Sequence, residues 1–234
     1  MISVYCSRAM LAVLLLGFSS GLPLMLVGKT LQVWMTDAGC DLTVIGLTGL
    51  VLLPYSIKVF WSPLLERWGS ARLGFRRSWM LATQLGLMLA LFAMSRWDPS
   101  QPLIVIVAMA LVVATISATQ DIAVDAWRID ALEPQELGAG ASVAILGYRC
   151  AVLASFAGAM HLAESLSWNQ VYVLMAAGQG LGLLGTFLAG CRREPPPAAT
   201  SLDQSLRVGL VEFVVRLRWR FVALIGFAVF YKYG

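Results

Sequence analysis

Charged residues are scarce in this sequence, and their scarcity excludes a soluble globular domain. Asp, Glu, Lys and Arg make up 13% of the 234 residues, whereas 59% are hydrophobic; a soluble domain carries about 25% charged residues. The mean hydropathy is +0.78. The net charge of +4 does not indicate a nucleic-acid partner, because the basic residues lie between apolar runs and form no continuous basic surface. The composition therefore predicts an all-α integral membrane protein.

Cysteine and histidine are also rare, which limits metal binding and catalysis. The four cysteines have no CxxC spacing, so we expect no disulfide framework, no zinc site and no other metal. Residues 17–21 match GxSxG, and with the single histidine, His161, they raise the alternative of an intramembrane serine protease. That motif requires a strand, a turn and a helix, and Ser19 is expected at a different depth from His161. We therefore expect no enzymatic activity.

Six apolar runs are each long enough to cross a membrane, which takes about 20 residues in a helix. The runs are residues 9–28, 42–57 continuing past Lys58, 78–95, 103–120, 137–163 and 165–191. The first run is too long for a secretory signal peptide, has no small-x-small cleavage site and continues apolar towards Trp34. We count it as a span.

The distribution of arginines between the loops predicts the orientation of the chain. Twelve arginines lie at the N-terminus or after the second, fourth and sixth runs: Arg8, Arg67, Arg72, Arg76, Arg77, Arg128, Arg192, Arg193, Arg207, Arg216, Arg218 and Arg220. The opposite loops hold only Arg96. By the positive-inside rule the N-terminus lies in the cytoplasm.

The composition changes after the sixth run and predicts three parts of the chain. Residues 1–191 form the six-span part, and residues 192–220 form a cytoplasmic linker that begins rich in Pro and Ala and ends in an amphipathic helix. Residues 221–234 begin a seventh apolar run. Fourteen helical residues span about 21 Å, less than the roughly 30 Å hydrocarbon core, so we expect a truncated seventh span.

The fourth run carries the most informative charges, because it ends in polar residues that a plain membrane anchor does not need. Gln120, Asp121, Asp125 and Arg128 follow directly on the apolar stretch. At 100° per residue, one helical stripe holds Ala114, Ser117, Ala118, Asp121, Asp125 and Arg128, with Gln120 on its flank. Ionisable residues inside a membrane are candidate functional residues by default.

Lys58 in the second run is the expected partner of Asp121. Counted along their helices, these residues lie roughly 22 and 27 Å below the outer surface, and a buried charge favours pairing with an opposite one. In the alternative, Lys58 reaches the cytoplasmic headgroups while Asp121 and Asp125 bind loop arginines. Arg149 lies near the middle of the fifth run, where it can bind a carboxylate or sugar oxygens, or pair with an aspartate.

Two further candidates, Lys29 and Gln32, lie near the outer end of the first run. Extension of the Lys29 side chain to the headgroups explains that lysine as well as substrate contact does.

Between the second and third runs, residues 63–79 read PLLERWGSARLGFRRSW. This loop resembles the loop signature of the major facilitator superfamily, which implies a cytoplasmic gate formed by Glu66, Arg67, Gly69, Arg76 and Arg77. The alternative is an ordinary basic loop.

Six segments together resemble one family within that superfamily, the AmpG muropeptide permeases of bacterial inner membranes. They are LGFSSGLP (16–23), GKTLQVW (28–34), PYSIKVFWSPLLER (54–67), ATQDIAVDAWR (118–128), GYR (147–149) and YKYG (231–234). The resemblance implies proton-driven import of N-acetylglucosaminyl-1,6-anhydro-N-acetylmuramyl peptides without a cofactor, for peptidoglycan recycling and, indirectly, β-lactamase induction. It also implies the N-terminal six-helix bundle, two inverted three-helix repeats in which spans one and four face a central cavity.

Members of the superfamily have two six-helix halves, so the resemblance implies a missing C-terminal half as the partner of this chain. Within that resemblance, the predicted substrate-binding or proton-coupling residues are Lys29, Gln32, Lys58, Gln120, Asp121, Asp125 and Arg149. The other predicted partners are a glycopeptide substrate and the lipid bilayer. The alternative from a different class is a membrane protein that packs against a partner half and transports nothing.

Overall fold

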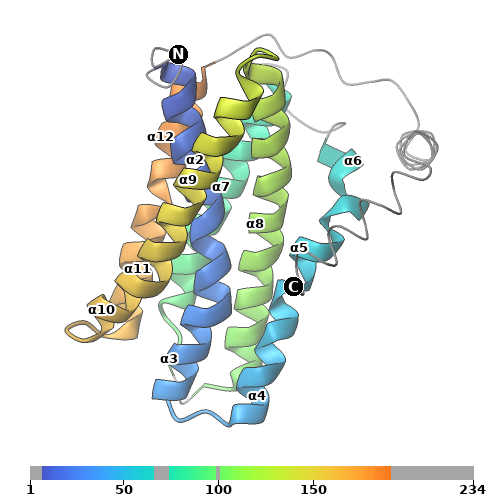
Figure 1. The fold of residues 1–234 in the computed structure, drawn as a ribbon. Helices are drawn as coiled ribbons and strands as arrows, with labels where there is room; N and C mark the ends of the chain where they lie inside the picture. The colour runs from blue at the N-terminus through green and yellow to red at the C-terminus, as the bar shows by residue number, and fades with distance from the viewer. Residues whose placement is uncertain (1–6, 66–73, 99–100, 191–234) are drawn as a thin grey trace, which may run out of the picture. The chain divides into compact units, whose positions relative to one another are not determined.

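The computed structural model describes residues 7–65, 74–98 and 101–190, and within them it is helical, with no strand. Within these described residues, six stretches are long and apolar enough to cross a membrane, as predicted (Figure 1). The first span contains α2 (Arg8–Met25), η1 (Leu26–Thr30) and α3 (Leu31–Asp37); the second contains α4 (Leu42–Leu47), η2 (Thr48–Leu52), α5 (Leu53–Ile57), η3 (Lys58–Phe60) and α6 (Ser62–Leu65). The third is α7 (Phe75–Met94), the fourth α8 (Leu103–Ala131), the fifth α9 (Leu137–Leu153), η4 (Ala154–Gly158) and α10 (Ala159–Ala163), and the sixth α11 (Trp168–Gly178) and α12 (Gly180–Ala189). The predicted linker and seventh run lie outside the described residues.

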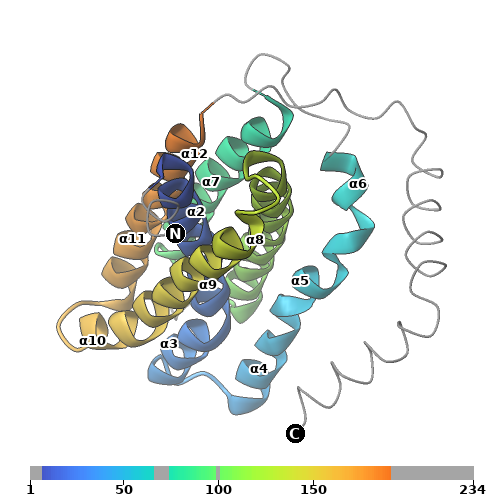
Figure 2. The same cartoon turned by 45° about the horizontal axis from the view of Figure 1, so that its top comes forward.

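Spans one and four lie side by side at the centre of the six helices (Figure 2). Helix α2 also packs against α9 and α12, while α8 packs against α7 and against η2 and α5 of the second span; the third and sixth spans contact each other. This set of contacts is unchanged when spans one to three are exchanged with spans four to six. Two three-helix repeats of inverted topology produce such a pattern.

Glycines bring α2 and α9 into backbone contact. A Cβ at Gly17 would lie 2.4 Å from the Ala144 carbonyl oxygen, and a Cβ at Gly147 would lie 2.2 Å from that of Leu14. Small residues allow membrane helices to approach this closely. Close packing therefore explains Gly17, whereas Gly28 marks a kink in η1, with φ −96° and ψ −107°.

Contacts with spans five and six hold the first span on both sides of this kink. The Tyr172 hydroxyl of span six donates to the Leu26 carbonyl oxygen at 2.7 Å, and the Thr30 hydroxyl of span one donates to the Ser155 carbonyl oxygen of span five at 2.7 Å. Trp34 is buried against the ring of Tyr172, with 4.6 Å between centroids. The two accepting carbonyls lie in the π-helical segments η1 and η4, so these hydrogen bonds join the irregular parts of spans one and five to neighbouring spans.

The second span differs from its prediction as one continuous apolar helix. Two 3₁₀ segments, η2 and η3, interrupt it, and many of its large apolar side chains are exposed, including Leu42, Leu50 and Phe60. Tight 3₁₀ turns have poorer hydrogen-bond geometry than an α-helix. The second span contacts the rest of the bundle mainly through α8 and η1.

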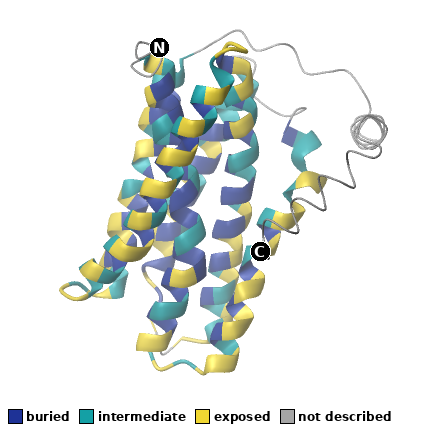
Figure 3. Cartoon of the chain, viewed as in Figure 1, coloured by how far each residue is buried: buried dark blue, intermediate teal, exposed yellow. Residues whose placement is uncertain are grey.

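Burial follows the expected membrane pattern, with apolar side chains both inside and outside (Figure 3). The interior contains two clusters of buried apolar residues, one around Trp34 and Leu87 and the other around Met10 and Trp127. The outer faces carry exposed Leu, Ile, Val and Phe on every span. Such surfaces suit lipid, and the polar side chains inside the bundle are therefore the informative ones.

Candidate functional site

Helix α8 carries the predicted charges. The apolar run was predicted to end at Gln120, and the helix continues beyond it to Ala131. Ala114, Ser117 and Ala118 of the predicted stripe are fully buried against the bundle, while Asp125 is exposed. The stripe is thus buried at one end and opens to the surface at the other. Its open end is where the charges lie.

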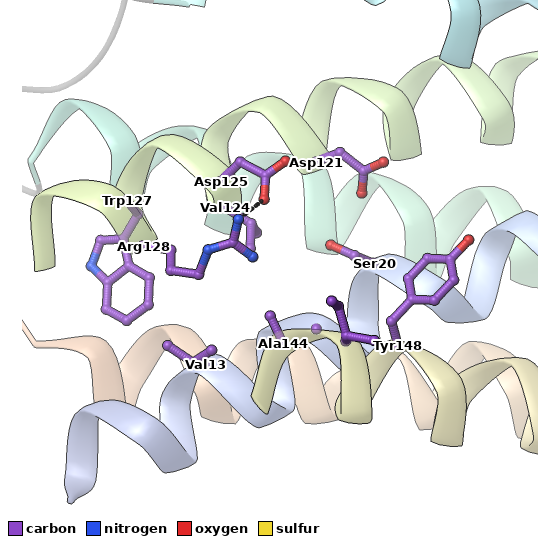
Figure 4. A pocket seen from close by; sticks show the side chains of 11 residues that line it. Val13, Ser20, Asp121, Val124, Asp125, Trp127, Arg128, Ala144 and Tyr148 are labelled. Carbon is purple, nitrogen blue, oxygen red and sulfur yellow. Dashed lines mark ion pairs between the residues drawn. The ribbon is translucent and has the colours of Figure 1, made fainter. Parts of the chain in front are cut away.

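The charges of α8 line a cavity of about 190 Å³ between spans one, four and five (Figure 4). Its polar lining consists mainly of Ser20, Asp121, Asp125, Arg128 and Tyr148. The remaining wall includes small or apolar residues of α2 and α9. A hollow with a few convergent polar groups in an apolar surround is the usual form of a small-molecule site.

Lys58 pairs with Asp121, as predicted, and joins the second span to the fourth. The Lys58 Nζ lies 3.3 Å from Asp121 Oδ2, and the side chains are 32% and 17% exposed. Asp121 Oδ1 is buried and has no hydrogen-bond partner among the described residues. The Ser20 hydroxyl faces this carboxylate across the cavity. One oxygen of Asp121 therefore binds the lysine, and the other remains available.

Asp125 and Arg128 form a second ion pair, but within one helix. Arg128 Nη2 lies 3.0 Å from Asp125 Oδ1, and the side chains are 25% and 53% exposed. A pair three residues apart on one helix does not join two spans, and it contributes little to stability when it is exposed. The two aspartates of the cavity thus have different partners: Asp121 binds a neighbouring span and Asp125 binds its own helix.

Lys29 and Gln32 lie together with Thr48 at the outer end of the bundle. Lys29 Nζ donates to Gln32 Oε1 at 3.4 Å, and Gln32 Nε2 donates to Thr48 Oγ1 at 3.4 Å. Lys29 is nine residues beyond Ser20 of the cavity, about 13 Å along the helix axis. The predicted site is therefore divided into an outer group around Lys29 and an inner group around Asp121.

Arg149 is exposed on α9, next to the cavity residue Tyr148. Among the residues that the structure describes, Arg149 forms no ion pair with an aspartate, which was the alternative role predicted for it. An exposed guanidinium near the middle of a span is costly in lipid, so this part of α9 must face water or a polar partner.

Gln120, predicted on the flank of the polar stripe, faces a different side of α8 from Asp121. The side chain is fully buried and points away from the cavity, into the interface with spans one and six, where it binds Ser19 and Gln179. Successive helical residues point 100° apart, so Asp121 and Gln120 necessarily face different neighbours. Gln120 therefore binds the first and sixth spans and is not among the residues that line the cavity.

Only part of the predicted gate loop is described. Arg76 forms an ion pair with Asp130, which joins the beginning of α7 to the end of α8, and Arg77 lies over the Phe187 ring at 5.7 Å from its centroid. Glu66, Arg67 and Gly69 lie outside the described residues.

The serine-protease alternative has no support in the geometry. Ser19 is fully buried and accepts two hydrogen bonds from glutamines, whereas His161 is 84% exposed and lies 3.4 Å from Glu164. A buried hydroxyl without the histidine beside it cannot act as an activated nucleophile.

The predicted site includes Asp121 and Asp125 of the polar cavity lining named above but not the other three residues, Ser20, Arg128 and Tyr148. Each lies inside a segment that carried the family resemblance, so the segments held the signal. Their side-chain directions depend on how α2, α8 and α9 are rotated, and the sequence does not show that rotation.

Comparisons with known proteins point to membrane transport. The family model described as acetyl-coenzyme A transporter 1 matches residues 9–98 and 100–190. The anhydromuropeptide permease of Escherichia coli K12 is 42% identical over 223 residues, which cover 94% of this chain and 45% of the relative. An uncharacterized protein of Haemophilus influenzae is 37% identical over 97% of this chain and 54% of its own length, and putative transporter AmpG 4 of Rickettsia felis is 36% identical over 70% and 41%. The chain thus spans about half the length of these relatives.

Proposed function

Because this chain belongs to the transporter family whose model is described as acetyl-coenzyme A transporter 1, and its relatives include anhydromuropeptide permeases, we propose that it forms the proton-coupling half of a muropeptide permease. The predicted resemblance to the AmpG permeases is confirmed. The chain is a multi-pass membrane protein. Import from periplasm to cytoplasm, proton symport and a cytoplasmic N-terminus belong to the proposal.

The observation that carries the proposal is the ion pair between Lys58 and Asp121 at the edge of a polar cavity. An apolar bundle needs no such pair for stability, because replacing a buried ion pair by apolar side chains is often neutral or stabilising. Intramembrane pairs of this kind mark ion and substrate pathways. The pair is therefore best explained by a step that requires charge.

Charge balance indicates how the pair couples a proton to an anionic substrate. When a proton binds Asp121, Lys58 keeps a positive charge that has lost its partner. A carboxylate of the peptide stem then restores neutrality by binding Lys58. Proton and substrate thus enter together, and release of the proton on the other side re-forms the pair and expels the carboxylate. The outer group around Lys29 is suited to the first encounter with the anion.

We also propose that transport requires a second set of spans. In alternating access the substrate lies between two halves, each of which supplies one wall of the cavity. Residues 1–234 expressed alone in spheroplasts of a permease-null strain should therefore insert into the membrane without taking up labelled anhydromuropeptide. Uptake above the null background would contradict this requirement.

The coupling role is tested in residues 1–234 fused to the second half of the Escherichia coli permease. Asp121→Asn should abolish accumulation driven by a proton gradient while exchange of labelled for unlabelled substrate continues, because the neutral amide mimics the protonated carboxyl. The matched control is Asp125→Asn on the same helix, which should retain gradient-driven accumulation. Accumulation by the Asp121 variant, or its loss in the Asp125 variant alone, would assign the proton to a different group.

A further inference from the structure

Three spans meet in a hydrogen-bonded group of uncharged polar side chains deep inside the bundle. Gln120 Nε2 and Gln179 Nε2 each donate to Ser19 Oγ at 2.8 Å, and Gln179 Nε2 also lies 3.2 Å from Gln120 Oε1. All three side chains have an exposed fraction of 0%. We call Ser19, Gln120 and Gln179 the amide triad. It joins α2, α8 and the turn between α11 and α12.

Gly182 lets the sixth span approach the triad. A Cβ at this position would lie 2.2 Å from Ser19 Oγ and 3.1 Å from Gln84 Nε2. No L side chain fits at that distance without displacing the serine. The triad therefore depends on a close approach of backbones, as polar groups between membrane helices usually do.

The triad lies one residue from the ion pair on α8. Gln120 faces spans one and six, and Asp121, about 100° further round the same helix, faces Lys58 of the second span. A side-chain tip lies roughly 5–6 Å from the helix axis, so rotating α8 by about 30° moves the Asp121 carboxylate by about 3 Å. That displacement is as long as the 3.3 Å contact itself. The rotation of α8 thus decides whether the ion pair forms.

We propose that Gln120 is a positioning residue: through the amide triad it fixes the rotation of α8 that brings Asp121 to Lys58. The second span is interrupted by two 3₁₀ segments and only 22% of its apolar stretch is buried, so its own packing does little to fix the rotation of α8. Apolar packing alone tolerates small helix rotations, because a Leu or Val side chain has no directional bond. The two hydrogen bonds of Gln120, one to Ser19 of span one and one to Gln179 of span six, do have direction.

A second buried amide supplies a matched control. Gln84 Oε1 accepts from Thr186 Oγ1 at 3.0 Å, and both side chains are fully buried between α7 and α12. This bond resembles those of the triad in burial and chemistry, but neither residue adjoins a charged group of the cavity. Loss of Gln84 should weaken the bundle without changing the direction of Asp121.

The experiment measures the ion pair directly in residues 1–234, in membranes treated with the hydrophobic reagent dicyclohexylcarbodiimide. The reagent activates the Asp121 carboxylate, the Lys58 amine attacks it to form an amide bond, and the elements of water leave with the reagent as a urea. The chain has three lysines, Lys29, Lys58 and Lys232, so mass spectrometry of peptides identifies the product unambiguously. The yield reports how often the two side chains are in contact.

Gln120→Met keeps the volume but removes two hydrogen bonds, and it should lower the yield of this product about eightfold, from typical values for interhelical hydrogen bonds in membranes. Gln84→Met should leave the yield within about twofold of the unchanged chain, since it removes a bond between α7 and α12 and none of the hydrogen bonds of Gln120. An unchanged yield in the Gln120 variant, or an equal loss in both variants, would overturn the proposal. If Gln120→Met does not insert, Ser19→Ala removes one of the two hydrogen bonds of Gln120 and should lower the yield about threefold.

The effect of Gln120 on transport rests on the proposed function, but its effect on the contact between Asp121 and Lys58 does not. The positioning role and the coupling role can therefore be refuted separately. In the fused permease, Gln120→Met should reduce gradient-driven accumulation in proportion to the cross-linking yield. A lost cross-link with full accumulation supports positioning by Gln120 and contradicts the coupling role of the Lys58–Asp121 pair. An unchanged cross-link with lost accumulation contradicts positioning.

Discussion

Removing either member of the Lys58–Asp121 pair should cost far more stability than removing both. At 3.3 Å and an effective dielectric constant of about 20, the Coulomb attraction is about 5 kcal/mol before the cost of burying the charges is subtracted. Lys58→Met leaves the Asp121 carboxylate without its partner in a largely buried place, which should cost about 3 kcal/mol. Asp121→Asn strands the lysine in the same way, whereas the double variant leaves no buried charge.

The assay is a double-mutant cycle on the free energy of unfolding, measured by circular dichroism as dodecyl sulfate is added to mixed micelles. We expect a coupling energy of about 1–3 kcal/mol for Lys58 and Asp121. The control cycle uses Asp125→Asn and Arg128→Met, an exposed pair on a single helix, for which about 0.5 kcal/mol or less is expected. A Lys58–Asp121 coupling no larger than the control would refute the view that the ion pair joins the second span to the fourth.

Three further predictions concern packing, the kink and a helix cap. Gly147→Ala should destabilise the bundle by about 1–3 kcal/mol because its Cβ meets backbone, while Gly138→Ala, with open space on the same helix, should be neutral or stabilising by up to about 1 kcal/mol in the same unfolding assay. Tyr172→Phe should cost about 1 kcal/mol, because it removes a buried hydrogen bond from span six to the kinked part of span one; an unchanged unfolding curve would contradict this. Hydrogen bonds from the side chain and amide of Thr43 hold the pKa of the Asp41 carboxyl below its usual range. Its capping contribution is therefore complete above about pH 4 and lost as the pH falls further. The protection of the Thr43 amide against exchange, relative to an unfolded peptide at the same pH, should fall in acid, and Asp41→Asn should remove this acid dependence.

The sequence alone determined that the part of the chain described by the structure contains six membrane spans, and it identified several residues of the site. Long apolar runs interrupted by loops leave no other arrangement for the backbone, since unpaired peptide groups are costly in lipid. The Lys58–Asp121 pair followed from depth along two helices and from the cost of an unpaired charge. Both inferences depend on quantities that are local to the chain: length, rise per residue and charge.

Rotation and irregularity of the helices were decided only by the tertiary structure. Gln120 and Asp121 are adjacent in sequence, yet one is buried in the triad and the other lines the cavity, because contacts with spans one, two and six set the rotation of α8. The π-helical turn at Gly28 is likewise stabilised by Tyr172, which lies 144 residues further along the chain. A periodic pattern states which residues share a face, but only packing between distant spans decides what that face meets.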